Sequence, residues 1–202
     1  QVDSILIIAM MTRLRQICCE PRMLYENYKG ESTKFTMCLE LIETLKENGK
    51  KVLLFSSFTS IFDSFIEEFK QRGIKYHMIT GAVDKKKRKE EVDAFQSDDS
   101  DVFLISLKAG GTGLNLTKAQ AVIHYDPWWN VSAQNQATDR AYRIGQTKNV
   151  LVYQLLMKNT IEAKIYEMQK RKKEMSDIFV ENSNGGISTL SKEELRDLFS
   201  ME

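Results

Sequence analysis

The chain has 202 residues, 42% of them hydrophobic, which suits one domain with an ordinary core and excludes wholesale disorder. Its formal net charge is +1, so any contact with nucleic acid must come from local basic residues rather than from a field over the whole molecule. The apolar stretch at residues 5–11 is too short to cross a bilayer and lacks the flanks of a signal peptide, so we expect an intracellular protein without a membrane partner.

Residues 5–11 run into a charged segment with the spacing of an amphipathic helix, and the chain begins at Gln1 without an initiator methionine. We therefore interpret the sequence as part of a longer polypeptide. The cysteines Cys18, Cys19 and Cys38 are odd in number and lack Cys-x-x-Cys spacing. This pattern indicates buried free thiols in a reducing compartment and argues against a zinc site, so we expect no metal bound by this chain.

Helical and strand patterns alternate through the middle of the chain. Apolar residues recur at helical spacing over residues 35–45 and 61–69, and a charged helix is predicted over residues 84–96. Short apolar runs predict buried strands at residues 52–55, 76–79, 102–105, 121–123 and 150–153. Strands separated by such helices predict an α/β fold in which a mostly parallel sheet lies between two layers of helices. Ligands bind such sheets at the carboxyl ends of the strands.

Residue types at the helix ends predict where several helices begin and stop. Thr33 is the expected cap before the first of these helices, and Gly49 and Gly73 are expected to end the first and second. A long charged helix is predicted over residues 159–180, with Asn159 and Glu162 as its capping box.

The apolar stripe of this last long helix is thin and consists of Ile161, Ile165 and Met168. We expect such a helix to be a strut that packs on a partner surface rather than a core helix. A short helix, capped by Ser191 and running to Phe199, is expected after it.

A glycine-rich turn directly follows the strand predicted at residues 102–105, which is where a ligand loop belongs in such a sheet. It contains Gly111, Gly113 and Asn115. Glycines allow backbone N–H groups to approach a phosphate or a ribose closely. Because similar glycine clusters occur in plain turns, the position after a buried strand is what favours a binding role.

Arg140 and Arg143 are three residues apart, so a helix would present both on one face, with Gln136 one turn earlier. Two guanidinium groups aimed together make a clamp for phosphate oxygens. The alternative is a pair of surface arginines in salt bridges with neighbours such as Asp139. The glycine turn and the arginine pair together predict a surface that senses and hydrolyses a nucleoside triphosphate.

Half of such a site is missing from the sequence. No Gly-x-x-x-x-Gly-Lys-Ser/Thr occurs in the chain, and no Asp-Glu pair is present to hold Mg²⁺ and position water. The chain is therefore predicted to supply one side of an active site.

Two further segments are candidates for nucleic-acid contact. The basic run at residues 85–89 is either a solvated helix face, balanced by Glu90 and Glu91, or a phosphate contact through Arg88. Trp128 and Trp129 are adjacent, and both cannot point inward from an extended segment, so one of them is expected to be exposed.

A family resemblance is carried by five stretches of the sequence. They are Val-Leu-Leu-Phe-Ser-Ser-Phe-Thr at residues 52–59, Thr80-Gly81 with Arg88, residues 106–116, His-Tyr-Asp-Pro-Trp-Trp-Asn at residues 124–130, and residues 136–146 with Asp-Arg-Ala-Tyr-Arg-Ile-Gly-Gln. Over roughly residues 12–180 the chain resembles the second RecA-like lobe of superfamily-two helicases, in particular the Swi/Snf-type DNA translocases. It departs from the family pattern at Val131, where proline is usual, and at Tyr142, where histidine is common.

The resemblance implies a role for each matching residue. Arg140 and Arg143 would be arginine fingers for the γ-phosphate of ATP, with Gln136 in support, and Mg²⁺ would be held by the absent first lobe. Gly111, Gly113 and Asn115 would line the nucleotide. The implied contacts with the backbone of double-stranded DNA are Ser56, Thr59, Thr80, Gly81, Arg88, Lys108 and Trp129.

The implied domain organisation has three parts. Residues 1–30 would be an inter-lobe linker helix, residues 31–158 the RecA-like second lobe, and residues 159–202 a brace helix with a helical appendage. The implied partners are the first lobe of the same polypeptide and duplex DNA, with RNA polymerase or another DNA-bound protein as a candidate for the complex that is remodelled. The compartment would be the cytoplasm or nucleoid of a bacterium, or the nucleus of a eukaryote.

Three other functions remain open from the sequence. The chain could be a RecA-like module that binds DNA or a partner without chemistry, which would not need both arginines. It could be a lobe of an RNA-unwinding helicase, against which the motif at residues 139–146 argues. A dinucleotide-binding enzyme is disfavoured, since no Gly-x-Gly-x-x-Gly follows a first strand.

Overall fold

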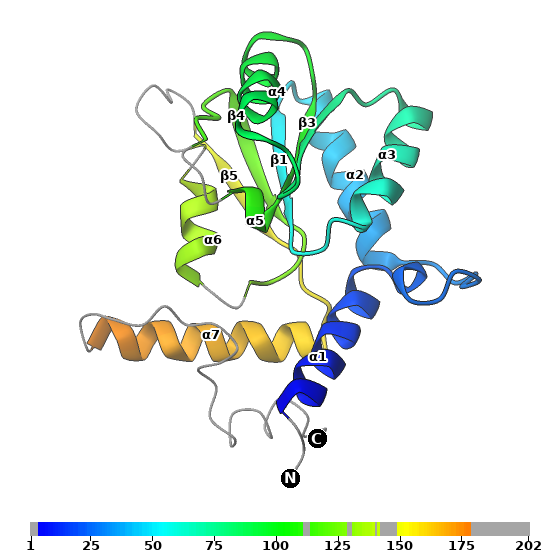
Figure 1. The fold of residues 1–202 in the computed structure, drawn as a ribbon, viewed down its shortest axis with the longest axis vertical. Helices are drawn as coiled ribbons and strands as arrows, with labels where there is room; N and C mark the ends of the chain where they lie inside the picture. The colour runs from blue at the N-terminus through cyan, green and yellow to red at the C-terminus, as the bar shows by residue number, and fades with distance from the viewer. Residues whose placement is uncertain (1–3, 111–113, 129–130, 140, 142–148, 179–202) are drawn as a thin grey trace.

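A single parallel sheet organises the chain in the computed structural model, which describes residues 4–110, 114–128, 131–139, 141 and 149–178. The strands are β1 (Lys51–Ser56), β2 (Tyr76–Ile79), β3 (Val102–Ser106), β4 (Ala119–His124) and β5 (Leu151–Gln154). Their order is β2-β3-β1-β4-β5, and every neighbouring pair is parallel (Figure 1). The predicted α/β fold and its strands are confirmed.

Helices cover both faces of the sheet, as the crossovers between parallel strands require (Figure 1). The described helices are α1 (Ser4–Cys19), α2 (Thr33–Glu47), α3 (Ile61–Arg72), α4 (Lys85–Ser97), α5 (Leu107–Gly110), α6 (Val131–Thr138) and α7 (Ile161–Ile178), with a 3-10 turn at Pro21–Met23. Among these helices, none is both long and apolar enough to cross a membrane.

The alternation of side chains along β1 explains the two cores of the molecule. Val52 and Leu54 face α2 and α3, whereas Leu53 and Phe55 face α4 and α6, because successive side chains of a strand point to opposite faces. All four are fully buried. The strand therefore reads as a continuous apolar run, which is what a sheet covered on both sides requires.

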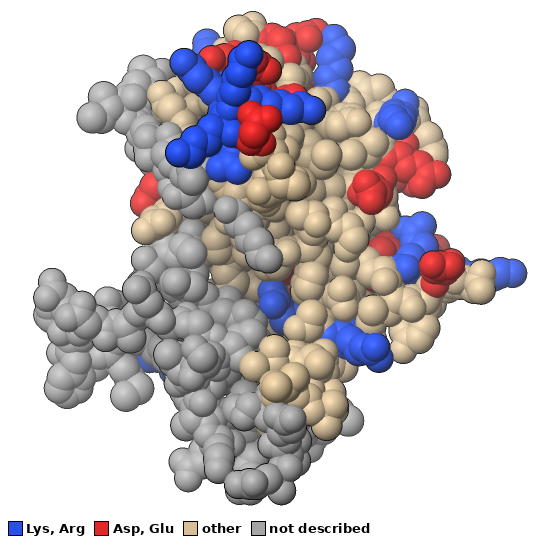
Figure 2. All heavy atoms as spheres, in the orientation of Figure 1, with Lys and Arg blue, Asp and Glu red and all other residues tan. Residues whose placement is uncertain are grey.

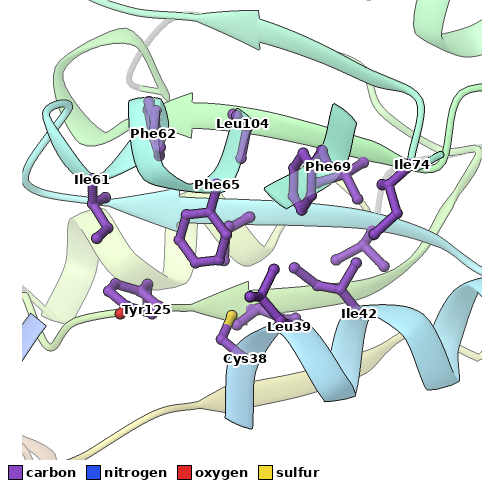
Figure 3. Packing of buried hydrophobic residues seen from close by; sticks show 14 of the residues in the cluster. Cys38, Leu39, Ile42, Ile61, Phe62, Phe65, Phe69, Ile74, Leu104 and Tyr125 are labelled. Atoms are coloured by element: carbon purple, nitrogen blue, oxygen red, sulfur yellow. The ribbon is translucent and has the colours of Figure 1, made fainter. Parts of the chain in front are cut away.

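Phenylalanines dominate the core on the α2 and α3 side. Phe62, Phe65 and Phe69 lie along one face of α3 and pack in one cluster with Leu39 and Ile42 of α2, on the same face of the sheet (Figure 3). Each fully buried side chain of this size stabilises the fold by about 1.5–3 kcal/mol relative to an exposed one. The helical spacing of the apolar residues thus specifies which face of α3 is buried.

Two predicted helix ends are right and two are wrong. Gly73 caps α3 in the left-handed conformation with φ +62°, and Gly49, at φ +66°, follows α2. Thr33 is the first residue of α2, and Ser32 occupies the cap position without a side-chain hydrogen bond. Asn159 also does not cap α7.

The start of α7 is capped by Thr160 in place of the predicted box of Asn159 and Glu162. The Thr160 hydroxyl accepts from the N–H of Glu162 at 3.2 Å and donates to the Met157 carbonyl at 2.7 Å. Asn159 has a φ of +57°, a left-handed turn that asparagine tolerates. The Glu162 carboxylate instead binds Lys34, as described below.

The apolar stripe of α7 packs on α1 of the same chain. Ile161 and Ile165 form a small cluster with Met11, and Met168 packs against it. The expected strut therefore contacts a helix more than 140 residues earlier in the chain. In Figure 1, α1 and α7 lie together below the sheet, beyond the ends of its strands.

Candidate functional site

Because all five strands are parallel, their carboxyl ends lie along one edge of the sheet, facing α1 and α7 (Figure 1). At this edge β1 ends in Ser56, β2 in Ile79, β3 in Ser106 and β4 in His124. The loops that follow contain most of the residues predicted to contact a ligand. Parallel pairing brings these loops together although they are far apart in the sequence.

Asp126 organises the centre of this edge. Its Oδ1 accepts the Ser56 hydroxyl at 2.8 Å and the Ser57 N–H at 2.9 Å, and its Oδ2 lies 2.9 Å from Arg15 Nη2. The carboxylate has no solvent exposure. A buried charge of this kind needs both an opposite charge and hydrogen bonds, and it has both.

The structure changes the role expected for Ser56. Its side chain is fully buried, and its hydroxyl donates to Asp126, so it is not available to a phosphate at the surface. The sequence indicates that Ser56 lies at the end of a strand, but it does not show the partner of the hydroxyl. Ser56 orders the loop after β1 instead.

The other predicted backbone contacts among the described residues are accessible. Thr59 is exposed in the turn before α3, and Thr80 and Gly81 form the turn before α4, half-buried and exposed respectively. Arg88 is half-buried, and its Nη2 donates to the Val83 carbonyl at 3.1 Å. Lys108 belongs to α5, but the position of its side chain is outside the described part of the structure.

The basic run at residues 85–89 begins α4 and is exposed apart from Arg88. Figure 2 shows basic side chains gathered over α4 with acidic ones among them. Asp84 caps the helix by accepting from the Lys87 N–H at 2.9 Å. This surface fits the solvated helix face, and Arg88 is the member that turns back toward the preceding loop.

The predicted nucleotide side of the site is described only in part. Gln136 is exposed on α6, and Asn115 is exposed after the glycine turn. Gly111, Gly113, Arg140 and Arg143 lie outside the described residues, as does Trp129. The predicted clamp of two arginines therefore stays a prediction.

Trp128, the last described residue before Trp129, is buried, with 5% exposure. Its ring meets His124 edge-on with centroids 5.8 Å apart and Phe55 at 6.2 Å. His124 Nε2 lies 2.9 Å from the Thr138 hydroxyl, and burial lowers the pKa of His124 to about 4. The neutral imidazole thereby ties the end of α6, two residues before Arg140, to the end of β4.

A second buried ion pair was not predicted. Lys34 Nζ of α2 lies 2.6 Å and 2.7 Å from the two carboxylate oxygens of Glu162 of α7, and both side chains are almost fully buried. Glu162 also accepts the Met157 N–H at 3.0 Å, and Lys34 lies over the Tyr125 ring. Desolvation raises the pKa of Glu162 even though the Lys34 charge opposes the shift.

This pair has a weak signal in the sequence. Lys34 precedes Phe35 and Glu162 follows Ile161, so each charge sits next to a core position. No local feature of the sequence indicates that these two residues, 128 positions apart, form an ion pair.

Within the described residues, no group of three or more His, Cys, Asp or Glu side chains is arranged to hold a metal ion. Asp126 is occupied by Arg15 and the Ser57 backbone, and Glu162 by Lys34. These residues therefore do not fit a Mg²⁺ site, and no step involving Mg²⁺ is assigned to them.

Sequence and structure comparisons identify the family. The family described as "Helicase conserved C-terminal domain" matches residues 33–145. The chain is 41% identical over 202 residues to an uncharacterized ATP-dependent helicase of Mycoplasma pneumoniae, covering 98% of this chain and 19% of that protein. It is 33% identical over 211 residues to the SWI/SNF-related matrix-associated actin-dependent regulator of chromatin subfamily A member 1 of Mus musculus, covering 96% of this chain and 20% of that protein.

A solved structure extends the likeness to three dimensions. The Sulfolobus solfataricus SWI2/SNF2 ATPase core in complex with dsDNA superposes with a TM-score of 0.79 at 32% identity, covering 98% of this chain and 42% of that chain. The chain spans about a fifth of the length of these two curated relatives. With its five-stranded parallel sheet and the family match over most of that sheet, the chain belongs to the helicase conserved C-terminal domain family, as the C-terminal RecA-like lobe of a Swi/Snf-type superfamily-two helicase.

Proposed function

We propose that the chain is the second motor lobe of an ATP-dependent translocase on double-stranded DNA, which remodels protein–DNA complexes. The observation that carries the proposal is the carboxyl edge of the sheet. There Thr59, Thr80 and Gly81 are accessible on the loops after β1 and β2, the two strands that flank β3, on a fold that matches an ATPase core in complex with dsDNA. Hydroxyl and backbone N–H groups on such loops suit phosphate oxygens.

On the DNA side, the proposed contacts with one strand are Thr59, Thr80, Gly81, Arg88 and Lys108, and Trp129 lies against the other strand. Ser56 holds the loop rather than the phosphate, since its hydroxyl is bound to Asp126. Phosphate contacts carry no sequence information directly, so the motor runs on any sequence.

On the ATP side, Arg140 and Arg143 act on the γ-phosphate with Gln136 in support, while Gly111, Gly113 and Asn115 line the nucleotide. The anchoring of α6 through Thr138 and His124 supports this assignment, because a finger must be held in place to act on transition-state charge. Mg²⁺ and the phosphate-binding lysine belong to a first RecA-like lobe of the same polypeptide. ATP binding pulls the lobes together, and hydrolysis releases them.

The proposed parts of the chain are a linker over residues 1–30, the lobe over residues 31–158 and a brace over residues 159–202. The contact of α1 with α7 supports a role for both in connecting the two lobes, since they pack on each other beside the ligand-binding edge.

The test uses the complete two-lobe polypeptide with Arg143→Ala or Arg140→Ala. Each change should lower DNA-stimulated ATP hydrolysis by about 10³–10⁵-fold while ATP still binds, because an arginine finger acts mainly on the transition state. Phosphate release and nucleotide affinity are measured on the same samples. The control is Arg72→Ala, which removes an exposed arginine that pairs with Glu43 and Glu68 and should leave turnover unchanged.

Three results would change the assignment. Near-normal turnover in either finger variant at saturating ATP makes that arginine structural. Absence of hydrolysis in the unmodified polypeptide favours a binding module without chemistry. Stronger stimulation by duplex RNA than by duplex DNA favours an RNA helicase.

A further inference from the structure

Arg15 of α1 joins two loops at the carboxyl edge through one nitrogen. Its Nη2 lies 3.1 Å from the Ser57 hydroxyl in the loop after β1. The same atom lies 2.9 Å from Asp126 Oδ2 and 3.0 Å from the Pro127 carbonyl in the loop after β4. The guanidinium also lies over the Phe58 ring, 5.1 Å from its centroid. The side chain is only 8% exposed, so these contacts form out of reach of competing water.

Asp126 completes the connection from the other side. While its Oδ2 binds Arg15, its Oδ1 accepts the Ser56 hydroxyl and the Ser57 N–H. The two loops are therefore built around a single buried pair of opposite charges. Without Arg15, the Asp126 carboxylate would be left buried with hydrogen bonds but no counter-charge, which costs enough to rearrange loops of this size.

Each of these loops leads to a proposed DNA contact. Thr59 is two residues beyond Ser57, and Trp129 is two residues beyond Pro127. We infer that Arg15 is a positioning residue that fixes the spacing between the two loops that hold DNA, so that the α1 segment sets the affinity of the lobe for the duplex. The inference rests on the proposed function.

Arg15 is not needed merely to attach α1 to the lobe, because α1 has other attachments. Met11 packs with Ile161 and Ile165 of α7. The Tyr125 hydroxyl donates to the Cys19 carbonyl at 2.6 Å, at the far end of the helix. Removing the Arg15 contacts should therefore leave α1 in place and act on the loops.

The experiment measures the affinity of the complete polypeptide for duplex DNA over a series of salt concentrations, with Arg15→Met as the main variant. Affinity should fall about tenfold, which is the scale of ordering one or two more side chains on binding. The log–log salt slope should stay unchanged, because Arg15 is buried and neutralises no phosphate. By contrast, Arg88→Ala, which removes a proposed direct contact, should lower that slope by about one.

A matched control separates positioning from general destabilisation. Lys34→Met removes the cation of the neighbouring buried pair, which joins α2 to α7 and reaches the loop after β4 at the Tyr125 ring rather than at Asp126 or Pro127. It should lower the melting temperature by at least as much as Arg15→Met while DNA affinity stays unchanged. Ser57→Ala keeps both charges and removes one Arg15 contact, so it tests the same idea in a variant that folds, with an expected loss of about twofold.

Each outcome decides the question. Unchanged DNA affinity in both Arg15→Met and Ser57→Ala overturns the inference and leaves the proposed function standing. A reduced salt slope in Arg15→Met also overturns it, since Arg15 would then contact a phosphate itself. Equal loss of affinity in Lys34→Met reduces Arg15 to a structural residue. If the unmodified polypeptide shows no salt-dependent DNA binding, the proposed function itself fails.

Discussion

His77 shows how a single side chain makes the stability of this lobe depend on pH. Its Nδ1 lies 2.7 Å from Glu91 and its Nε2 lies 2.7 Å from Asp98. Partial burial disfavours the charged ring, but the hydrogen bonds to Asp98 and Glu91 outweigh it, so the pKa of His77 is raised. Despite some desolvation, bonds from Ser100 and His77 lower the pKa of Asp98.

The sign of each shift sets the pH window. A raised histidine pKa stabilises the fold fully below about pH 6.5, and the contribution is lost as pH rises through the folded pKa. A lowered carboxyl pKa stabilises the fold above about pH 4 and is lost as pH falls. The His77–Asp98 pair is therefore worth most between these values.

We predict that His77→Gln lowers the melting temperature more at pH 5.5 than at pH 8.5, because only the charged ring donates to both carboxylates. The other histidine of the chain, His124, supplies a control of opposite sign. Burial lowers the pKa of His124 to about 4, so the folded protein holds this ring neutral. The contribution of His124 to stability is therefore complete above about pH 6.5 and is lost as pH falls toward 4. A penalty for His77→Gln that does not change with pH would contradict the charged bridge.

At the scale of elements, the buried pair of Lys34 and Glu162 is the polar contact that fixes α7 against α2. The apolar stripe of α7 is thin, so the direction of the helix depends on this pair as well as on the packing against α1. A buried ion pair stabilises little compared with a hydrophobic pair of the same shape, but breaking it leaves an unpaired charge.

We predict that Lys34→Met alone destabilises the chain by about 3–5 kcal/mol, because the Glu162 carboxylate is then buried without its counter-charge. Adding Glu162→Gln should recover at least half of that loss. The amide can still accept the Met157 N–H, and no charge remains buried. Denaturant unfolding of both single variants and the double variant gives the coupling free energy between Lys34 and Glu162. Additive losses would mean that the two charges do not act as a pair.

At the scale of the whole molecule, the proposed function gives the chain one half of a nucleotide site. Its sequence contains no phosphate-binding lysine loop, and the described residues contain no acidic cluster for Mg²⁺. Phosphoryl transfer depends on positioned phosphates and metal, and the proposal assigns the groups that hold them to the first lobe.

We therefore predict that the isolated chain of 202 residues releases no phosphate from ATP above background, with or without duplex DNA. The matched positive sample is the complete polypeptide at equal concentration. A melting curve confirms that the isolated chain is folded during the assay. DNA-stimulated turnover by the folded chain alone would contradict the half-site.

Most of the fold could be predicted because its signals are local. β1 and β3 lie within two residues of their predicted positions, since a strand buried on both faces must be an uninterrupted apolar run. Gly73 ends α3 as predicted, because a left-handed residue after a helix favours glycine. The caps at Thr33 and Asn159 failed because several residues near each helix start can cap it, and packing chooses among them.

The sequence by itself determined the family, the parallel sheet and the loops of the candidate site, because these follow from the residues next to each strand. Only the tertiary structure decided that Ser56 is buried against Asp126, that Arg15 binds Asp126, 111 residues later, and so joins two loops, and that Lys34 meets Glu162. The physical reason is that a charge can be buried only where a partner arrives, and the partner comes from an element placed by closure of the whole fold.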